Sequence, residues 1–215
     1  MMVAESDILN ASILIVDDQA VNVSLLERLL REAGYACVAS TTNPYEVCAL
    51  HRKNRYDLIL LDLRMPGMDG FQVMEGLKTN DADGDLPILV ITAQPGHKLR
   101  ALQAGAKDFI SKPFDLVEVK TRIHNMLEVR LLYKKLENDN KMLKRLDRTK
   151  NEFLSTVSHE LRTPLTSIRD SLEALASGSA GSLSDTARSF VENAQNDCER
   201  MIRLISDLQH SHSDS

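Results

Sequence analysis

The sequence contains no tryptophan and few aromatic residues of any kind, so its core has to be built from aliphatic side chains. Aromatic residues make up 4% of the 215 residues, whereas hydrophobic residues make up 43%. The longest apolar runs, at 13–16 and 58–61, fall far short of the roughly 20 residues that cross a bilayer. The N-terminus lacks the basic-then-apolar order of a signal peptide. We therefore expect a cytoplasmic protein with no membrane segment.

Clustered basic residues and paired cysteines are also missing. The net charge is −5, and a nucleic-acid interface needs lysine and arginine gathered on one surface. Nucleic acid is therefore not expected as a partner. Cys37, Cys48 and Cys198 lie far apart and show no CxxC spacing. They are expected to be reduced thiols rather than a disulfide framework or a zinc site.

Residues 12–115 alternate short apolar runs with amphipathic helical patterns. The expected strands are 13–17, 36–40, 57–62, 87–92 and 107–111. Their Val, Ile and Leu residues do not alternate with polar ones, which is typical of parallel strands that are covered on both faces. The pattern predicts a doubly wound α/β fold with a five-stranded parallel sheet. The ligand crevice of such a fold lies at the carboxyl ends of its strands.

From about residue 114 onward the strand patterns disappear. Apolar residues then recur every three or four positions from Val129 to Val157, and a second such helix follows a loop at 177–184. The first stripe fits either a coiled-coil seam or a face packed against a neighbouring domain. The two helices predict an all-α helical hairpin, and two hairpins would pair into a homodimeric four-helix bundle. The expected divisions are an N-terminal tail at 1–11, the α/β domain at 12–125, a coiled-coil helix at 126–147, the hairpin domain at 148–209 and a C-terminal tail at 210–215.

Acidic residues follow two of the expected strands. Asp17 and Asp18 come after the first strand, and Asp62 ends the third. If these strands are neighbours, the three carboxylates meet, and oxygen ligands of this kind select Mg²⁺. Lys112 and Thr92 would bring an ammonium and a hydroxyl group to the same place, which makes a phosphoryl-transfer site with Asp62 as nucleophile. Taken singly, an Asp-Asp pair is more often a helix cap, and it is the joint placement at strand ends that favours the site.

The segments ILIVDD, YDLILLDLRMPGMDGF, ITA and GAKDFISKPF resemble the receiver (response-regulator) family over residues 12–125. The resemblance implies a flavodoxin-like fold with Asp62 as the phosphoacceptor. It also implies Mg²⁺ ligands and phosphoryl contacts, namely Asp17, Asp18, Asp62 and the backbone carbonyl of Arg64 for the metal, and Thr92 and Lys112 for the phosphoryl group. Phe109 matches the aromatic residue that reorients with Thr92 on activation, although a plain core role fits equally. The stretch 92–112 is shorter than usual in the family, with Pro95 and Gly96 where the fourth helix begins, so a shortened helix is expected.

Among the six histidines, only His159 has neighbours that suggest chemistry. Glu160 can accept its ring proton and leave the other nitrogen as a nucleophile. Pro164 removes a helix hydrogen bond and would bend the helix just beyond the histidine. Thr163 lies one turn from Glu160, so hydroxyl and carboxylate could hold a water together. An isolated helical histidine is usually a solvated surface residue, and His51 is expected to be one.

The run KNEFLSTVSHELRTPLTSI resembles the H-box of histidine-kinase dimerisation and phosphoacceptor domains, over about residues 145–209. The resemblance implies that His159 is phosphorylated and that Glu160 is its acid/base partner. Glu160 and Thr163 match the E-x-x-T pattern linked to dephosphorylation of a partner receiver. No glycine-rich nucleotide-binding motif occurs in the sequence. The chain is therefore not expected to use ATP by itself, and an ATP-binding kinase domain is an expected partner.

Three accounts of function remain open at this point. In the first, the chain is an excised part of a hybrid histidine kinase, in which Asp62 regulates the His159 domain through the coiled-coil helix. In the second, it is a stand-alone phosphorelay phosphotransferase that passes phosphoryl groups between Asp62, His159 and partner proteins. In the third, it is a non-catalytic regulator whose dimer packing responds to Asp62. The first is favoured, because the sequence ends at the close of the second expected helix, before any motif of an ATP-binding domain.

Overall fold

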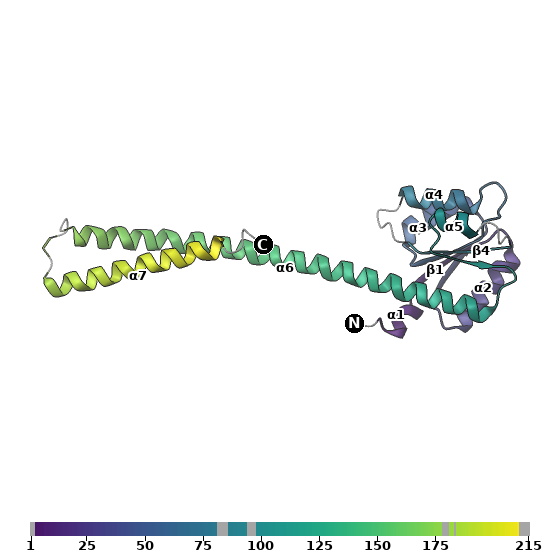
Figure 1. Cartoon of the computed structure of the whole chain (residues 1–215), viewed down its shortest axis with the longest axis horizontal. Helices are drawn as coiled ribbons and strands as arrows, with labels where there is room; N and C mark the ends of the chain where they lie inside the picture. The colour runs from purple at the N-terminus through teal and green to yellow at the C-terminus, as the bar shows by residue number, and fades with distance from the viewer. Residues whose placement is uncertain (1–2, 81–85, 94–97, 178–180, 183, 211–215) are drawn as a thin grey trace. The chain divides into compact units, whose positions relative to one another are not determined.

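The computed structural model describes residues 3–80, 86–93, 98–177, 181–182 and 184–210. It divides into two compact units, Met1–Glu137 and Asn138–Ser215. The first unit is an α/β domain and the second is a helical hairpin (Figure 1). Both match the predicted fold classes.

The first unit is built on a five-stranded parallel sheet. Its strands are β1 (Ser12–Val16), β2 (Cys37–Thr41), β3 (Leu58–Leu61), β4 (Ile88–Thr92) and β5 (Asp108–Ser111). Their order is β2-β1-β3-β4-β5, and every neighbouring pair is parallel. The predicted strands are confirmed to within one residue at each end. Because β1 and β3 are neighbours, the residues that follow them meet at one edge of the sheet.

Helices cover both faces of this sheet. The helices of the chain are α1 (Glu5–Leu9), α2 (Ala20–Glu32), the short 3₁₀ helix η1 (Pro44–Glu46), α3 (Val47–Asn54), α4 (Gly70–Asn80), α5 (Lys98–Gln103), α6 (Leu116–Ala176) and α7 (Asp185–His210). In the first unit, α2 and the start of α6 pack on one face, and α3, α4 and α5 pack on the other (Figure 1). None of the helices in the described ranges combines the length and the apolar character of a membrane-crossing segment.

The central strands β1, β3 and β4 are almost entirely apolar because each face of the sheet has its own core. Ile13 and Ile15 face the core shared with α2 and α6. Leu14 and Val16 face the core shared with α3, α4 and α5. Successive strand residues point to opposite faces, so a strand covered on both sides must be apolar at every position. This explains why the sequence shows no alternation here.

Three local features differ from the sequence-based expectations or extend them. The residues expected to form an N-terminal tail include α1, and its Ile8 is buried in the core. His51, expected to be solvated, is 5% exposed on α3, and its ring lies 6.3 Å from that of Tyr56. The helix expected to be short is α5, with six described residues. Pro95 and Gly96 lie outside the described residues, as does the tail after residue 210.

The start of α6 belongs to the first unit. Val119, Ile123 and Leu127 are fully buried against the sheet, and about two turns further along the helix Lys134 forms an ion pair with Asp57. The compact unit therefore includes this part of the helix, as far as Glu137. The helix then continues without a break to Ala176, with Pro164 inside it.

The second unit has only a small core of its own. Leu165 on α6 packs against Cys198 and Ile205 on α7, with Ile202 beside them. The Cys198 thiol donates a hydrogen bond to the Leu165 carbonyl at 3.1 Å. Many other large apolar side chains of this unit remain exposed, including Leu143, Leu146, Phe153, Ile168, Phe190, Met201 and Leu204.

Candidate functional site

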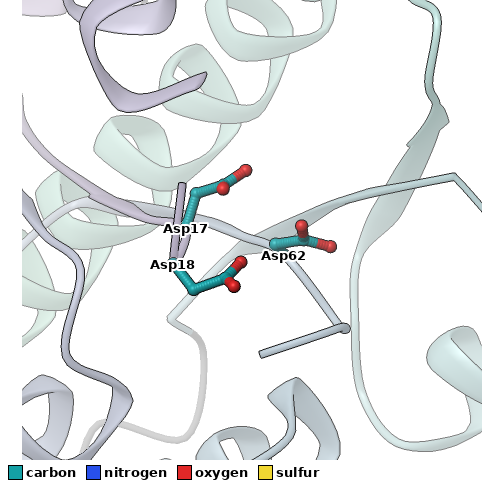
Figure 2. Close-up of side chains that lie close together, drawn as sticks. All are labelled: Asp17, Asp18 and Asp62. Carbon is teal, nitrogen blue, oxygen red and sulfur yellow. The ribbon is translucent and has the colours of Figure 1, made fainter. Parts of the chain in front are cut away.

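Three carboxylates meet at the carboxyl ends of β1 and β3. Asp17 and Asp18 directly follow β1, and Asp62 directly follows β3. One carboxylate oxygen from each lies within 4.8 Å of the others, and Figure 2 shows the three side chains side by side. Asp17 and Asp62 are 2% and 6% exposed. The three carboxylates therefore lie together, as predicted, because β1 and β3 are neighbours in the sheet.

Asp17 is held by groups from the start of α2. Its Oδ1 accepts a hydrogen bond from the Gln19 backbone N–H at 2.9 Å, and the Asn22 amide donates to both of its oxygens at 3.0 Å. The helix α2 has Gln19 as its N-cap, with no side-chain cap hydrogen bond. The structure therefore does not support the alternative in which Asp17 or Asp18 is the N-cap of this helix.

Lys112 neutralises part of the negative charge. Its Nζ lies 2.7 Å from Asp17 Oδ2 and 2.8 Å from Asp62 Oδ2. It follows β5, and its backbone N–H donates to the Thr92 carbonyl at 2.8 Å, which fixes it beside the end of β4. Burial by itself lowers the pKa of Lys112, but the hydrogen bonds that it donates to Asp17 and Asp62, and the charges of these carboxylates, raise the pKa above its usual value. The side chain is therefore an ammonium throughout the neutral range.

One oxygen of the cluster is left without a partner. Asp18 Oδ1 is buried and accepts no hydrogen bond within the described part of the chain. Buried carboxylate oxygens normally have a partner, and three carboxylates with one ammonium leave net negative charge. An all-oxygen donor set of this kind fits a hard divalent cation such as Mg²⁺. Arg64 lines the same cleft, and its backbone N–H donates a hydrogen bond to Asp62 Oδ1 at 3.2 Å.

Thr92 and Phe109 lie near this edge of the sheet on β4 and β5. Thr92 ends β4 and is 1% exposed, and it pairs with Ser111 across the ladder. Phe109 is half-buried against the α3–α5 core, and the Lys98 ammonium lies 4.2 Å above its ring. Phe109 therefore packs partly in the core and partly under an exposed helix.

The cleft also includes residues that the sequence motifs did not single out. Asn22, Asp69 and Arg100 line it together with Asp18 and Asp62. The Arg100 guanidinium, on α5, lies 4.0 Å above the ring of Phe71. Nothing in the local sequence around Arg100 predicts this position, because it depends on how α5 and α4 pack. The spacing of Asn22, one turn into the helix after Asp17 and Asp18, was an available signal.

Gly70 is the first residue of α4, and it is required because this helix closely approaches the residues that follow β3. A Cβ atom on Gly70 would lie 2.6 Å from the Asp62 carbonyl oxygen and 2.9 Å from Leu63 Cα. Such contacts are too close for any side chain, and the atoms that would have to move are backbone. Gly70 therefore allows the first turn of α4 to pack against the backbone of Asp62 and Leu63.

Replacing Lys112 by methionine should destabilise the first unit. The substitution leaves Asp17 and Asp62 buried without their cation, so we expect the free energy of unfolding to fall by about 3 kcal/mol in the presence of EDTA. Added Mg²⁺ should restore part of this loss, because it binds the folded carboxylates. Thermal denaturation followed by circular dichroism measures both effects. An unchanged melting temperature in EDTA would show that the Lys112 ion pairs contribute nothing.

His159 lies on α6 in the second unit. His159 and Glu160 are both exposed, and their side chains form no hydrogen bond with each other in the described structure. Consecutive helical residues do not face each other, so Glu160 as proton acceptor remains a prediction. The Thr163 hydroxyl donates to the His159 carbonyl at 3.4 Å. The residues one turn before and after it, Ser155, Thr156, Arg162 and Thr163, are exposed as well, which places His159 on a solvated face of the helix.

Comparison with known proteins assigns both units. The model of the response regulator receiver domain matches residues 13–124, which is 112 of the 215 residues. The chain belongs to the response regulator receiver family. The model of the His Kinase A (phospho-acceptor) domain matches residues 149–215. The predicted pairing of a receiver with a phosphoacceptor domain is confirmed, and this domain order belongs to two-component signalling.

Relatives of two kinds match the chain. The response regulator PleD of Caulobacter vibrioides is 36% identical over 130 residues, covering 60% of this chain and 28% of PleD. Hybrid signal transduction histidine kinase D of Dictyostelium discoideum is 26% identical over 242 aligned positions, covering 91% of this chain and 16% of that protein. The chain thus spans less than a third of the length of either relative.

Solved receiver structures match the first unit. A response regulator from Chloroflexus aurantiacus has 34% identity and a TM-score of 0.52, covering 55% of this chain and 98% of that one. The receiver domain of a sensor histidine kinase from Pseudomonas aeruginosa has 30% identity and a TM-score of 0.51, with the same coverage. That structure holds a magnesium ion in its active-site cleft. These neighbours confirm the flavodoxin-like receiver fold.

Proposed function

We propose that this chain is the receiver and phosphoacceptor part of a hybrid histidine kinase, with Asp62 as regulatory phosphoacceptor and His159 as the histidine that the kinase phosphorylates. The observation that carries the proposal is the joining of the two sites by one helix. The helix α6 packs on the receiver sheet through Ile123 and Leu127 and continues to His159 without a break. The match to a hybrid kinase across 91% of the chain supports the same reading.

In the receiver, Asp62 is proposed to attack the phosphorus of a phosphodonor. A bond forms between a carboxylate oxygen and phosphorus while the bond to the leaving group breaks, which gives an aspartyl phosphate. Lys112 is within reach of the Asp62 carboxylate and would contact the new phosphoryl oxygens. Thr92 is proposed to bind the same group from the end of β4. The charge of Lys112 lowers the barrier, because negative charge spreads over these oxygens in the transition state.

Asp17, Asp18, Asp62 and the Arg64 carbonyl are the proposed ligands of Mg²⁺. The metal would supply positive charge to the phosphoryl oxygens. The protein's own contribution is to hold the donors in place. Asn22 and the Gln19 N–H fix Asp17, while Asp18 Oδ1 keeps an unused buried acceptor for the ion.

Phosphorylation is proposed to act on α6 through the end of the sheet. The switch residues would be Thr92 and Phe109, and Lys112 joins β5 to the phosphoacceptor. Any shift of Lys112 toward the phosphoryl group alters its ion pairs and the segment that leads directly into α6 at Leu116. A rotation or register shift of the helix would then reach His159, since helices move as rigid elements with discrete packings.

In the second unit, His159 is proposed to receive a phosphoryl group from ATP bound to a separate kinase domain. Glu160 would act as acid/base partner, and Glu160 with Thr163 would position a water for dephosphorylation of a receiver. The exposure of His159 and Glu160 supports this, because a kinase domain has to reach them. The Thr163 hydroxyl would have to leave the His159 carbonyl for that purpose.

The exposed apolar residues of the hairpin are proposed to pair two chains. Phe190, Met201 and Leu204 lie on one stripe of α7, and Phe153 and Ile168 are comparably exposed on α6. Exposed large apolar residues in such density usually mark an interface. Pairing of two hairpins into a four-helix bundle would bury them.

Replacing Leu204 by aspartate should dissociate the dimer. Leu204 is 56% exposed in one chain. The substitution would bury a negative charge in the core of the four-helix bundle, so we expect the dimer dissociation constant to rise at least about a hundredfold. Sedimentation equilibrium of the full chain measures it. Val117→Asp is the matched control, because Val117 is 69% exposed in the first unit and should leave the dimer intact. A monomeric parent chain would contradict the proposal.

One labelling experiment separates this proposal from the stand-alone phosphotransferase. The chain is incubated with a small phosphodonor and Mg²⁺, and acid-stable label on Asp62 is compared with base-stable label on His159. We expect label on Asp62 alone, with His159 labelled only when ATP and a kinase domain are added. Movement of the label from Asp62 to His159 without a kinase domain would favour the phosphotransferase.

A further inference from the structure

A pocket lies on the receiver at the opposite end of the sheet from Asp62. It has a volume of about 370 Å³ and lies between α6 and the residues that precede β4 and β5. Its lining is Pro87, Lys107, Asn125, Met126, Val129, Arg130 and Tyr133. The volume is at the lower end of the roughly 300–1,000 Å³ that is usual for small-molecule sites.

Arg130 is the unusual residue of this pocket. It is 7% exposed, yet its Nε has no hydrogen-bond partner among the described residues. Its neighbours on the helix are different, because Arg122 pairs with Asp108 and Glu118, and Lys134 pairs with Asp57. Burying a guanidinium without an anion is unfavourable, so a partner is needed to offset the loss of hydration.

The rest of the pocket is suited to an apolar group. Met126 and Val129 line it from α6, Pro87 lines it from the segment before β4, and Tyr133, also in the lining, is 59% exposed. Val129, at which the predicted coiled-coil stripe begins, is 52% exposed here. Lys107 adds a second positive charge to the lining. Apolar walls around a planar cation are complementary to a planar anion with an apolar body.

We propose that this pocket binds a small carboxylate that carries an apolar or aromatic group, with its carboxylate on the Arg130 guanidinium. A carboxylate is favoured because its two oxygens match the guanidinium in a bidentate pair. The apolar group rests on Met126 and Val129. The ligand bridges α6 to the start of β4, so it would stabilise the docked form of the helix that leads to the phosphoacceptor domain. This inference goes beyond the proposed phosphotransfer, and the binding test below does not depend on phosphotransfer.

The test uses the full chain with methyl-labelled methionine and phenylacetate as the probe. The Met126 methyl signal should shift saturably, while the signal of Met74, fully buried in the opposite core, should not move. Phenylacetamide, which has the same shape without the charge, should bind at least about tenfold more weakly, because a hydrogen bond to a charged group is lost. Equal binding of the amide, or no saturable Met126 shift, would overturn the proposal.

Two variants test the role of the guanidinium. Arg130→Met should abolish phenylacetate binding and raise the melting temperature, because it removes a buried cation that lacks a partner. Arg122→Met is the matched control on the same helix, and it should lower the melting temperature by breaking two ion pairs. If Arg130→Met lowered the melting temperature as Arg122→Met does, or retained phenylacetate binding, the proposal would fail.

A third variant addresses the aspartates at 81, 83 and 85, which precede Pro87 in the sequence and lie outside the described residues. Replacing all three by asparagine should leave phenylacetate binding unchanged. Binding that occurs only in this variant would show that Arg130 is reserved for the chain's own carboxylates, and it too would overturn the proposal.

Discussion

Replacing Asp62 by asparagine should abolish labelling of the chain by a small phosphodonor. Asparagine has nearly the same shape and can still accept a hydrogen bond from Lys112, but its amide is not a nucleophile. We expect the rate of phosphorylation to fall at least about a thousandfold, the scale on which removal of a covalent nucleophile acts. Intact-mass spectrometry of the chain, with and without Mg²⁺, measures the loss directly.

The control for Asp62 is another acid of the same cleft. Asp69 lines the cleft, and its carboxylate accepts the Gln72 N–H at 2.9 Å at the start of α4. Asp69→Asn preserves this hydrogen bond and should be labelled at the parent rate. Persistent labelling of Asp62→Asn, or equal loss in Asp69→Asn, would place the phosphoryl group on another residue.

Replacing His159 by glutamine should abolish base-stable labelling of the second unit. The experiment supplies ATP and the separately produced ATP-binding domain of a hybrid histidine kinase. Because the imidazole nitrogen is the proposed nucleophile, we expect at least about a thousandfold loss of label. His159 is exposed on α6, so the substitution should leave the melting temperature unchanged, and the loss can be assigned to chemistry rather than folding.

Two further variants define what the residues around His159 contribute. Glu160→Gln keeps the nucleophile but removes the carboxylate, and we expect a loss of about 10²- to 10⁴-fold, the usual range for general acid–base catalysis. His124→Gln, on the receiver part of the same helix, should have no effect. If the Glu160→Gln variant were labelled at the parent rate, Glu160 would not be the acid/base partner. The proposal that His159 is the phosphoacceptor would be unaffected.

Much of the receiver could be predicted from the sequence because the information is local. The central strands β1, β3 and β4 are apolar at almost every position, since helices cover both faces of the sheet, and each acid of the site directly follows one of them. Once the strands are assigned, a parallel sheet with β1 beside β3 brings Asp17, Asp18 and Asp62 together. The same locality holds for His159, whose significance comes from the residues within one helical turn of it.

The details of the site depended on packing. Lys112 could be expected near the carboxylates, but its simultaneous contact with Asp17 and Asp62 joins residues 95 and 50 positions away in the sequence. The position of Arg100 over Phe71 and the burial of His51 likewise follow from how helices pack, not from local pattern. Such contacts are set by the relative placement of elements that no short sequence window contains.

The helices illustrate the same division. The apolar stripes predicted two long helices, but a stripe does not say which of its residues face the partner helix and which remain exposed. In the hairpin, Cys198 and Ile205 are buried whereas Phe190 and Met201 are not, because two helices cover only one side of each stripe. On the receiver, only the folded chain shows that α6 stays in contact with the sheet domain as far as Lys134 and buries Arg130. The sequence determined the elements and their chemistry, and the tertiary structure decided which charges and apolar faces lack partners, since burial depends on neighbours that are distant in the chain.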